Sequence, residues 1–175
     1  RSFGDALARG LLKAVLPRPT VFRVAVAVGR AARPLLPASL ADRLPPTQIA
    51  GASWPKAAGH QRRMLALAGC VQPSLAPNIN AATARVFSRL GIDLFEEAKA
   101  GCCGAVRFHL NDHEAAKKDM RRNIDAWWPH IEAGVEAIVV TASGCGVQVR
   151  EYAHMLADGT VEAEKAAKIS ALCRD

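Results

Sequence analysis

AGCCGAVRF, residues 100–108, places two adjacent cysteines between glycines in a chain that holds five cysteines in all. Adjacent cysteines form a strained disulfide with each other, so such a pair more often serves a metal or a cluster, or pairs with thiols elsewhere in the fold. Four of the five cysteines stand next to a glycine near the end of an apolar run: Cys70, Cys102, Cys103 and Cys145. We take these four as the candidate site, and they point to inorganic chemistry.

Three short apolar runs precede the cysteines and are typical of buried strands: residues 63–69, 92–97 and 135–142. Helical patterns follow them at 78–90, at 105–133 with a restart near 111–114, at 147–156 and at 161–173. This alternation predicts an α/β fold, a small doubly wound parallel sheet with helices on both faces. Each cysteine loop is then expected at the carboxyl edge of the sheet, where open α/β sheets bind ligands.

Residues 1–62 differ from the rest in charge and composition. The net charge is +7, but residues 1–63 hold eleven Lys and Arg against two acids, whereas residues 64–175 hold twelve against fourteen. Helical spacing, interrupted by prolines, predicts helices at 3–16 and 21–32, a helical turn at 39–44 and a linker at 45–60 in which Trp54 is a packing contact. The predicted organisation is a basic helical connecting segment and linker at 1–62, followed by a cysteine-rich α/β domain at 63–175.

The basic segment indicates either a surface that docks on acidic protein or on anionic lipid, or plain solvated helix faces. It also resembles an organelle transit peptide. We expect no nucleic acid partner, because no aromatic residues are interleaved with the basic ones and no recognition motif is present. An odd number of cysteines with an adjacent pair does not suit a secreted disulfide framework. We therefore expect a cytoplasmic protein, with peripheral association at the inner membrane as an option. Because the chain starts at Arg1 and not at Met, we also expect a fragment or a processed chain.

The loop between a strand and a helix offers unpaired backbone N–H groups and the positive end of the helix dipole, and both favour a thiolate. Four thiolates that converge there suit an iron–sulfur cluster or a zinc ion. An adjacent pair is awkward for one tetrahedral metal, since one backbone step restricts both sulfur directions. A cluster with several irons accepts the pair more easily, because the two thiolates reach different irons.

Other chemistry-bearing residues have simpler interpretations. Cys173 is expected to be an incidental buried thiol. His109 and His113 lie four residues apart but lack a third ligand, so we place them on the surface or behind the site. For Arg107, two interpretations are equally open: it balances the negative charge of a cluster or a carboxylate, or it forms a surface ion pair. Asn78 and Asn80 can hydrogen-bond to the site or cap a helix. Trp127 and Trp128 are expected in the core and on a docking surface. No Ser-His-Asp grouping, GxGxxG or P-loop is present, so hydrolase and nucleotide-binding functions have no support.

Three segments carry a resemblance to a known family. GCVQPSLAPNINAATARVF (69–87), AGCCGAVRFHLNDHEAAKKDMRRNIDAWWP (100–129) and ASGCGVQVREYAHML (142–156) resemble the iron–sulfur subunit of bacterial glycolate oxidase (glycolate dehydrogenase), within the cysteine-rich CCG domain family related to heterodisulfide reductase. The resemblance is dense from about residue 64 to the end. The ferredoxin module and the second CCG repeat of that family have no counterpart in this sequence.

The resemblance implies a non-catalytic subunit that relays electrons from a flavin (FAD) subunit, which oxidises glycolate to glyoxylate, toward the quinone pool. It implies an iron–sulfur cluster, of the 4Fe-4S type, on Cys70, Cys102, Cys103 and Cys145. The fullest CCG pattern ends in Cys-x-x-Cys and uses five thiols, whereas Ala142 and Gln148 flank Cys145 at that spacing. Two alternatives stay open: a cluster-free subunit-docking module, and a thiol–disulfide switch in which Cys102 or Cys103 pairs with Cys70 or Cys145.

Overall fold

A parallel sheet forms the centre of the molecule. The computed structural model describes residues 3–42, 53–157 and 161–175. Within them four strands pair in the order β2-β1-β3-β4, and every pairing is parallel. The strands are β1 (Arg62–Ala66), β2 (Ile92–Glu96), β3 (Ile138–Val139) and β4 (Cys173–Arg174). The predicted parallel α/β fold is confirmed.

Helices connect the strands and extend the chain at its amino-terminal side. Before the sheet come α1 (Phe3–Val15), α2 (Pro19–Ala31), the 3-10 turn η1 (Arg33–Leu35) and α3 (Ala38–Ala41). Around the sheet lie α4 (Gln72–Leu75), α5 (Asn78–Arg89), α6 (Ala105–His109), α7 (His113–Glu132), α8 (Ser143–Arg150), α9 (Tyr152–Met155) and α10 (Val161–Leu172). No helix in these described ranges has the length and apolar character that crossing a bilayer requires.

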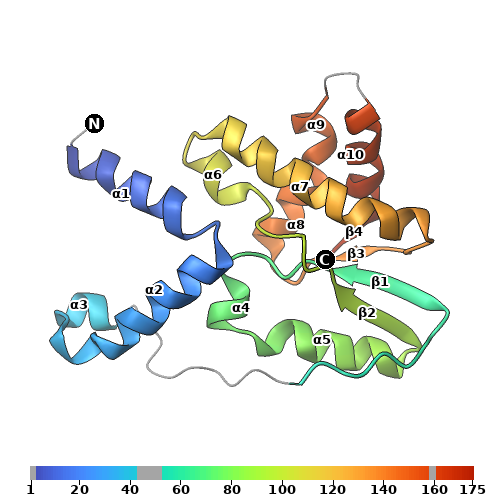
Figure 1. The fold of residues 1–175 in the computed structure, drawn as a ribbon, viewed down its shortest axis with the longest axis horizontal. Helices are drawn as coiled ribbons and strands as arrows, with labels where there is room; N and C mark the ends of the chain where they lie inside the picture. Colours follow the sequence, from blue (N-terminus) through green and yellow to red (C-terminus); the bar gives the residue numbers. More distant parts are fainter. Residues whose placement is uncertain (1–2, 43–52, 158–160) are drawn as a thin grey trace.

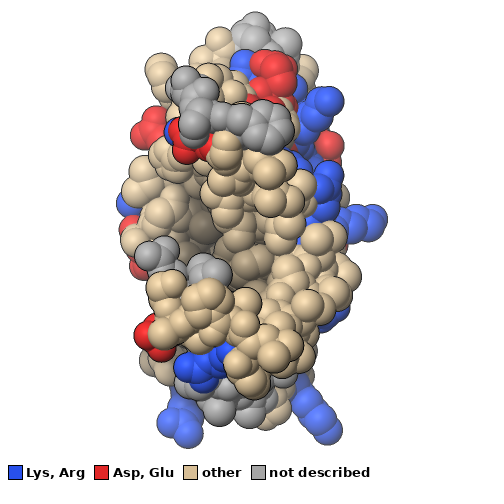
Figure 2. Space-filling model, turned by 90° about the vertical axis from the view of Figure 1, so that its left-hand side faces the viewer, with Lys and Arg blue, Asp and Glu red and all other residues tan. Residues whose placement is uncertain are grey.

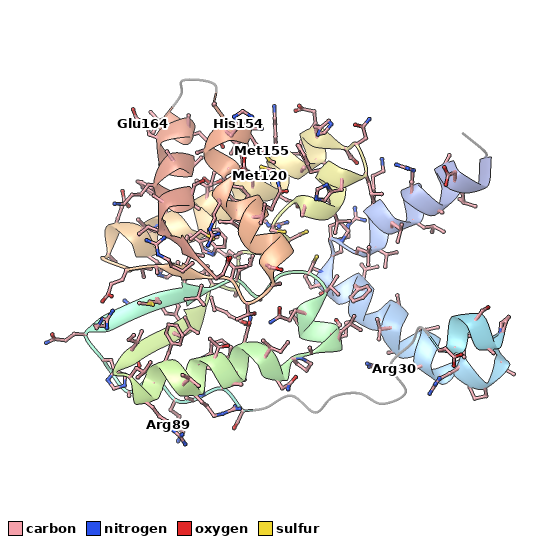
Figure 3. All side chains as sticks on the ribbon, turned by 180° about the vertical axis from the view of Figure 1, so that it is seen from behind. Arg30, Arg89, Met120, His154, Met155 and Glu164 are labelled. Carbon is pink, nitrogen blue, oxygen red and sulfur yellow. The ribbon has the colours of Figure 1, made fainter. Side chains whose placement is uncertain are left out.

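The two faces of the sheet bury different side chains because successive residues of a strand point to opposite sides. On one face Leu65 and Ile138 pack with Trp127 of α7 and Ile169 of α10 in the larger core. On the other face Ala66, Leu94 and Val139 pack with Ala84 of α5 in a smaller core. Figure 1 shows α5 on one side of the sheet and α7 and α10 on the other, and Figure 3 shows their side chains filling the space on both sides. Helices therefore cover both faces, as predicted.

The structure differs from the sequence prediction at several elements, among them the unpredicted short helix α4 and the turn η1. The third apolar run, 135–142, forms a strand only at Ile138–Val139. The helix expected at 147–156 is divided into α8 and α9, and α8 begins at Ser143, so Cys145 lies in its first turn and not in a loop. The last helix ends at Leu172, and Val140 donates a backbone hydrogen bond to Arg174 (2.8 Å), which adds the unpredicted β4.

The amino-terminal helices lie beside the carboxyl edge of the sheet (Figure 1). Helix α2 packs against α4, the short helix that follows Cys70, and Lys13 of α1 forms an ion pair with Asp112 (3.4 Å). The predicted helices at 3–16 and 21–32 are confirmed as α1 and α2. Part of the helical turn and half of the linker, at residues 43–52, lie outside the described residues. The division of the chain at residue 62 stays a prediction.

The end of the linker is attached to the domain through Trp54. Its indole Nε1 donates to the carbonyl of Leu94 (3.2 Å), and its ring packs on the smaller core. We expect Trp54→Ala to lower the free energy of unfolding by about 1–2 kcal/mol, because a half-buried aromatic ring and one hydrogen bond are lost. Urea denaturation measures this, with the exposed Lys56→Ala as control. Equal stability of the two variants would contradict the attachment.

Candidate thiol site

The four candidate cysteines lie at the carboxyl edge of the sheet, on three different connections. Cys70 follows β1, Cys102 and Cys103 follow β2, and Cys145 follows β3 within the first turn of α8. Because the three strands are parallel and adjacent, their carboxyl ends deliver these segments to one place. The sequence predicted this convergence from the order of its apolar runs.

The thiols form a continuous row. Cys102 hydrogen-bonds to both Cys70 and Cys103. Cys103 in turn donates to Cys145, with 3.2 Å between the two Sγ atoms. Cys70, Cys102 and Cys103 are buried and Cys145 is partly exposed, and all four are free thiols. The row therefore runs from the interior to the surface, with Cys145 at its accessible end.

Hydrogen bonds within the row shift the pKa values of its thiols in opposite directions. Hydrogen bonding with Cys103 and with Cys70, aided by the Gly104 N–H and the charge of Arg107, lowers the pKa of Cys102 to about 3. The same contacts raise the pKa of Cys103 and of Cys70 above their ordinary value, and burial adds to both effects. The pKa of Cys145 is lowered by its hydrogen bond with Cys103. These contacts therefore favour the thiolate form at Cys102, which is the form that binds metal.

A cavity of about 320 Å³ lies against the row, and its walls are mainly apolar. Three of the four cysteines, Cys70, Cys103 and Cys145, form part of its lining. Figure 2 views the molecule from the side toward which the strands point, and shows a hollow lined by uncharged residues, with charged side chains at its margins. Three of the thiols therefore border a hollow whose walls are mainly apolar.

Glycines let the CCG loop take its shape. Gly104 has φ +95° and precedes the first residue of α6, and a Cβ there would stand 3.1 Å from the carbonyl of Ala116. A Cβ at Gly101 would stand 2.6 Å from the guanidinium of Arg122, which packs on the loop. Gly104 therefore needs glycine for its left-handed backbone, whereas a side chain at Gly101 would require the end of the flexible Arg122 side chain to move aside.

Basic residues flank Cys102. Arg107 of α6 bonds to the buried Asp119 (2.6 Å), which also pairs with Arg122 (3.1 Å). Arg122 then donates to the carbonyl of Cys102 (3.2 Å). Of the two interpretations of Arg107, the structure shows an ion pair, and the same side chain also stabilises the Cys102 thiolate by its charge. The acidic partner in this cluster, Asp119, was missed by sequence reasoning.

Two further residues that hold the loop, Asn123 and Tyr152, were also missed. Asn123 accepts from the Gly101 N–H (2.8 Å) and donates to the carbonyl of Cys102 (2.9 Å), and Tyr152 donates to the carbonyl of Cys103 (2.9 Å). A signal for Asn123 exists in the sequence, since a polar residue three positions after Met120 and four before Trp127 falls on the apolar face of a helix. Nothing local marks Tyr152.

Several other predicted residues lie apart from the thiols. His109 is exposed, and His113 contacts Asn111 (3.1 Å) and the ring of Phe108, so both are surface residues. Asn80 does not reach the cysteines; it donates to the carbonyl of Leu67 (3.2 Å) and to Glu96 (2.8 Å) and joins the ends of β1 and β2.

Cys173 is buried, and its Sγ contacts the carbonyl of Gly146 (3.7 Å) outside the row. This is the incidental buried thiol that the sequence indicated. Trp127 is fully buried in the larger core, as predicted, and Trp128 stacks under Lys165, 5.0 Å from the ring centre.

The row can be compared with the geometry of a metal site. Among the residues described, no group of three or more His, Cys, Asp or Glu side chains surrounds one point as a single metal ion requires. A single zinc ion needs every sulfur at about 2.3 Å. A cluster distributes its thiolates over several irons, so it suits sulfurs that follow one another in a row beside a cavity. The donor set fits a cluster better than a single ion.

Comparison with known proteins places this site in a family. The family model described as "Cysteine-rich domain" (CCG) matches residues 64–150. The chain belongs to the CCG cysteine-rich domain family. All four cysteines of the row lie within the matched residues.

The chain is also similar to individual proteins whose names include an iron–sulfur subunit. Over all 175 residues the chain is 49% identical to the "Glycolate oxidase iron-sulfur subunit" of Escherichia coli (strain K12), and it covers 43% of that protein. Over 108 residues, 61% of the chain, it is 31% identical to the "Probable glycolate oxidase iron-sulfur subunit" of Bacillus subtilis (strain 168), of which it covers 23%. These matches confirm the family resemblance expected from the three segments.

A third relative has a different name. The "Lactate utilization protein A" of Bacillus cereus (strain B4264) is 30% identical over 102 residues, 58% of the chain and 40% of that protein. The chain thus spans less than half the length of these curated relatives. No solved structure matches it.

Proposed function

We propose that this CCG domain is the electron-transferring iron–sulfur module of an oxidoreductase complex that acts on glycolate. The observation that carries the proposal is the convergence of four thiols beside a mainly apolar cavity at the carboxyl edge of the sheet. The names of the relatives supply the substrate. One of them is named for lactate utilization, so the substrate class is a small 2-hydroxy acid, with glycolate favoured by the higher identity.

Cys70, Cys102, Cys103 and Cys145 would hold the cluster, which supplies reversible one-electron chemistry when bound. The groups around the four cysteines influence the sulfurs through charge, hydrogen bonding and exclusion of water. The Gly104 N–H and Arg107 stabilise negative charge on the Cys102 sulfur. The mainly apolar walls of the cavity limit water at the sulfurs, which influences a cluster's reduction potential.

In this proposal no substrate binds on the chain. Glycolate would be oxidised to glyoxylate on a partner subunit that carries FAD, and electrons would pass through a 4Fe-4S cluster on this module toward a quinone. Cys145, the partly exposed end of the row, is the natural point of electron exchange, since electron transfer is faster over shorter distances. The complex would be cytoplasmic, and the basic helices α1 and α2 would provide peripheral contact with the inner membrane or with the partner subunits.

The experiment is a reductive titration of anaerobically reconstituted protein. Thiolate-ligated iron is expected to absorb near roughly 400 nm, and the band should bleach with dithionite and return with an oxidised electron acceptor. Bleaching and return over several cycles would support an electron carrier. A reconstituted chain that has no such band, or a band that does not respond to reductant, would refute it.

The contact between Cys103 and Cys145 favours a second candidate, a thiol–disulfide switch in a chain without cluster. Their sulfurs are 3.2 Å apart. Oxidation would break two S–H bonds, form one S–S bond and pass two electrons and two protons to an oxidant such as hydrogen peroxide. We expect the cluster-free chain to lose two of its five titratable thiols after mild peroxide treatment, and to regain them with dithiothreitol. Five thiols before and after treatment would exclude the switch.

A further inference from the structure

Two buried side chains from different helices direct their polar atoms onto the CCG loop. Asn123 of α7 and Tyr152 of α9 are both 0% exposed. The Oδ1 of Asn123 accepts from the Gly101 N–H, and its Nδ2 donates to the carbonyl of Cys102 and to the hydroxyl of Tyr152 (3.1 Å). The Tyr152 hydroxyl donates onward to the carbonyl of Cys103. Every donor hydrogen of the pair is used, and three of its four hydrogen bonds end on residues 101–103.

We propose that Asn123 and Tyr152 are positioning residues, which fix the orientation of the two peptide groups that follow Cys102 and Cys103 and thereby set the hydrogen bonds that the sulfurs receive. The inference rests on the proposed function, because its redox consequence needs a bound cluster. Its structural part concerns residues of this chain alone. We call this pair the loop clamp.

The reason lies in the geometry of one peptide group. The carbonyl held by Tyr152 belongs to the peptide between Cys103 and Gly104, and the N–H of that same peptide donates to the sulfur of Cys102. A trans peptide is planar, with its C=O and N–H pointing in opposite directions. Fixing the oxygen therefore aims the N–H at the sulfur. Burial raises the pKa of Tyr152, so its hydroxyl keeps the proton that it donates.

Asn123 fixes the orientation of the preceding peptide group. It holds the carbonyl of Cys102, and the N–H of that peptide belongs to Cys103. Its bond to the Gly101 N–H fixes the entrance of the loop, and its bond to Tyr152 joins the two holding groups. Hydrogen bonds in such a chain polarise one another, so loss of either member weakens the bonds of the other.

The test compares three variants in the anaerobically reconstituted chain. Tyr152→Phe removes only the hydroxyl, and Asn123→Leu removes three hydrogen bonds at similar volume. The matched control is Ser170→Ala, since Ser170 donates to the carbonyl of Val149 (3.1 Å), accepts from the Ala153 N–H (3.1 Å) and does not touch the loop. The readouts are the midpoint potential, the electron paramagnetic resonance spectrum, the rate of iron loss to a chelator, and melting temperature.

The loop clamp predicts a negative shift of the midpoint potential and an altered spectrum for Tyr152→Phe, because a sulfur that loses an N–H donor stabilises the reduced state less. For Asn123→Leu it predicts iron loss on the order of ten-fold faster, from several lost hydrogen bonds. Ser170→Ala should lower the melting temperature and leave the potential unchanged. Variants that all melt lower yet keep the wild-type potential and spectrum would overturn the proposal and leave a purely structural role.

A second measurement is independent of the cluster. In the chain without iron, Cys102 and Cys103 are buried, so iodoacetamide should alkylate them slowly. Opening of the loop in Asn123→Leu should speed alkylation at both cysteines by about ten-fold, and Ser170→Ala should not. Equal rates in all variants would overturn the loop clamp. If the wild-type chain binds no iron, the proposed function fails, and this measurement still decides the inference.

Discussion

Replacing Cys102 by serine is expected to abolish iron binding, from about four iron atoms per reconstituted chain to fewer than about one. Cys102 interacts with both Cys70 and Cys103, and its pKa is lowered there, so its loss removes a central sulfur donor that favours the thiolate form. A serine hydroxyl does not ionise near neutral pH, and its harder oxygen is a poor substitute for sulfur. Iron and acid-labile sulfide per chain provide the measurement.

The control for this variant is Cys173→Ser. Cys173 is equally buried and lies close to the segment of Cys145, but it is not part of the row. Iron content should remain at the wild-type level, because only an incidental thiol has been removed. If both serine variants lose iron to the same extent, the loss reflects general damage to the fold, and the assignment of Cys102 as a ligand falls.

Substituting alanine at Gly104 is expected to lower the free energy of unfolding by about 2–4 kcal/mol. An L-residue in the left-handed region costs about 1–2 kcal/mol, and here the backbone has φ +95°. The new Cβ would also lie 3.1 Å from the Ala116 carbonyl, so α6 or α7 must shift, which costs about 1 kcal/mol or more. Because Gly104 donates to Cys102, the variant should also bind iron less firmly.

The matched control is Gly134→Ala, at a backbone φ of +89° with no atom within 4 Å of the added Cβ. It isolates the cost of the left-handed backbone, so we expect about 1–2 kcal/mol in urea denaturation and unchanged iron binding. If the two alanine variants are equally destabilised, the close approach of the CCG loop to α7 contributes nothing, and our description of the loop is wrong.

The arrangement of the sheet was predictable because it depends on local patterns. Short apolar runs that alternate with helical patterns indicated parallel strands, and parallel strands bring Cys70, Cys102 and Cys145 to one edge. The start of α8 was missed because the glycines at 144 and 146 are poor helix formers. Glycines are less unfavourable in the first helical turn, where the backbone N–H groups have no intrahelical partners. Strand β4 was missed because two residues carry no periodicity.

The surroundings of the thiols were less predictable, since they depend on contacts between distant parts of the chain. Tyr152 reaches Cys103 across 49 positions, and only the packing of α9 against the loop brings them together. Asp119 and Asn123 are polar residues on the buried face of α7. Helical periodicity identifies them as polar exceptions on an apolar face, but it does not indicate which residues they contact. Such exceptions on an apolar face are therefore the places to search for groups that support a site.

The most direct test of the central claim is the amount of iron and acid-labile sulfide bound per chain after anaerobic purification and reconstitution. We predict about four of each for the wild-type chain, as a 4Fe-4S cluster on Cys70, Cys102, Cys103 and Cys145 requires. No iron after careful reconstitution would contradict the electron-transfer role and leave a cluster-free docking module or a thiol–disulfide switch.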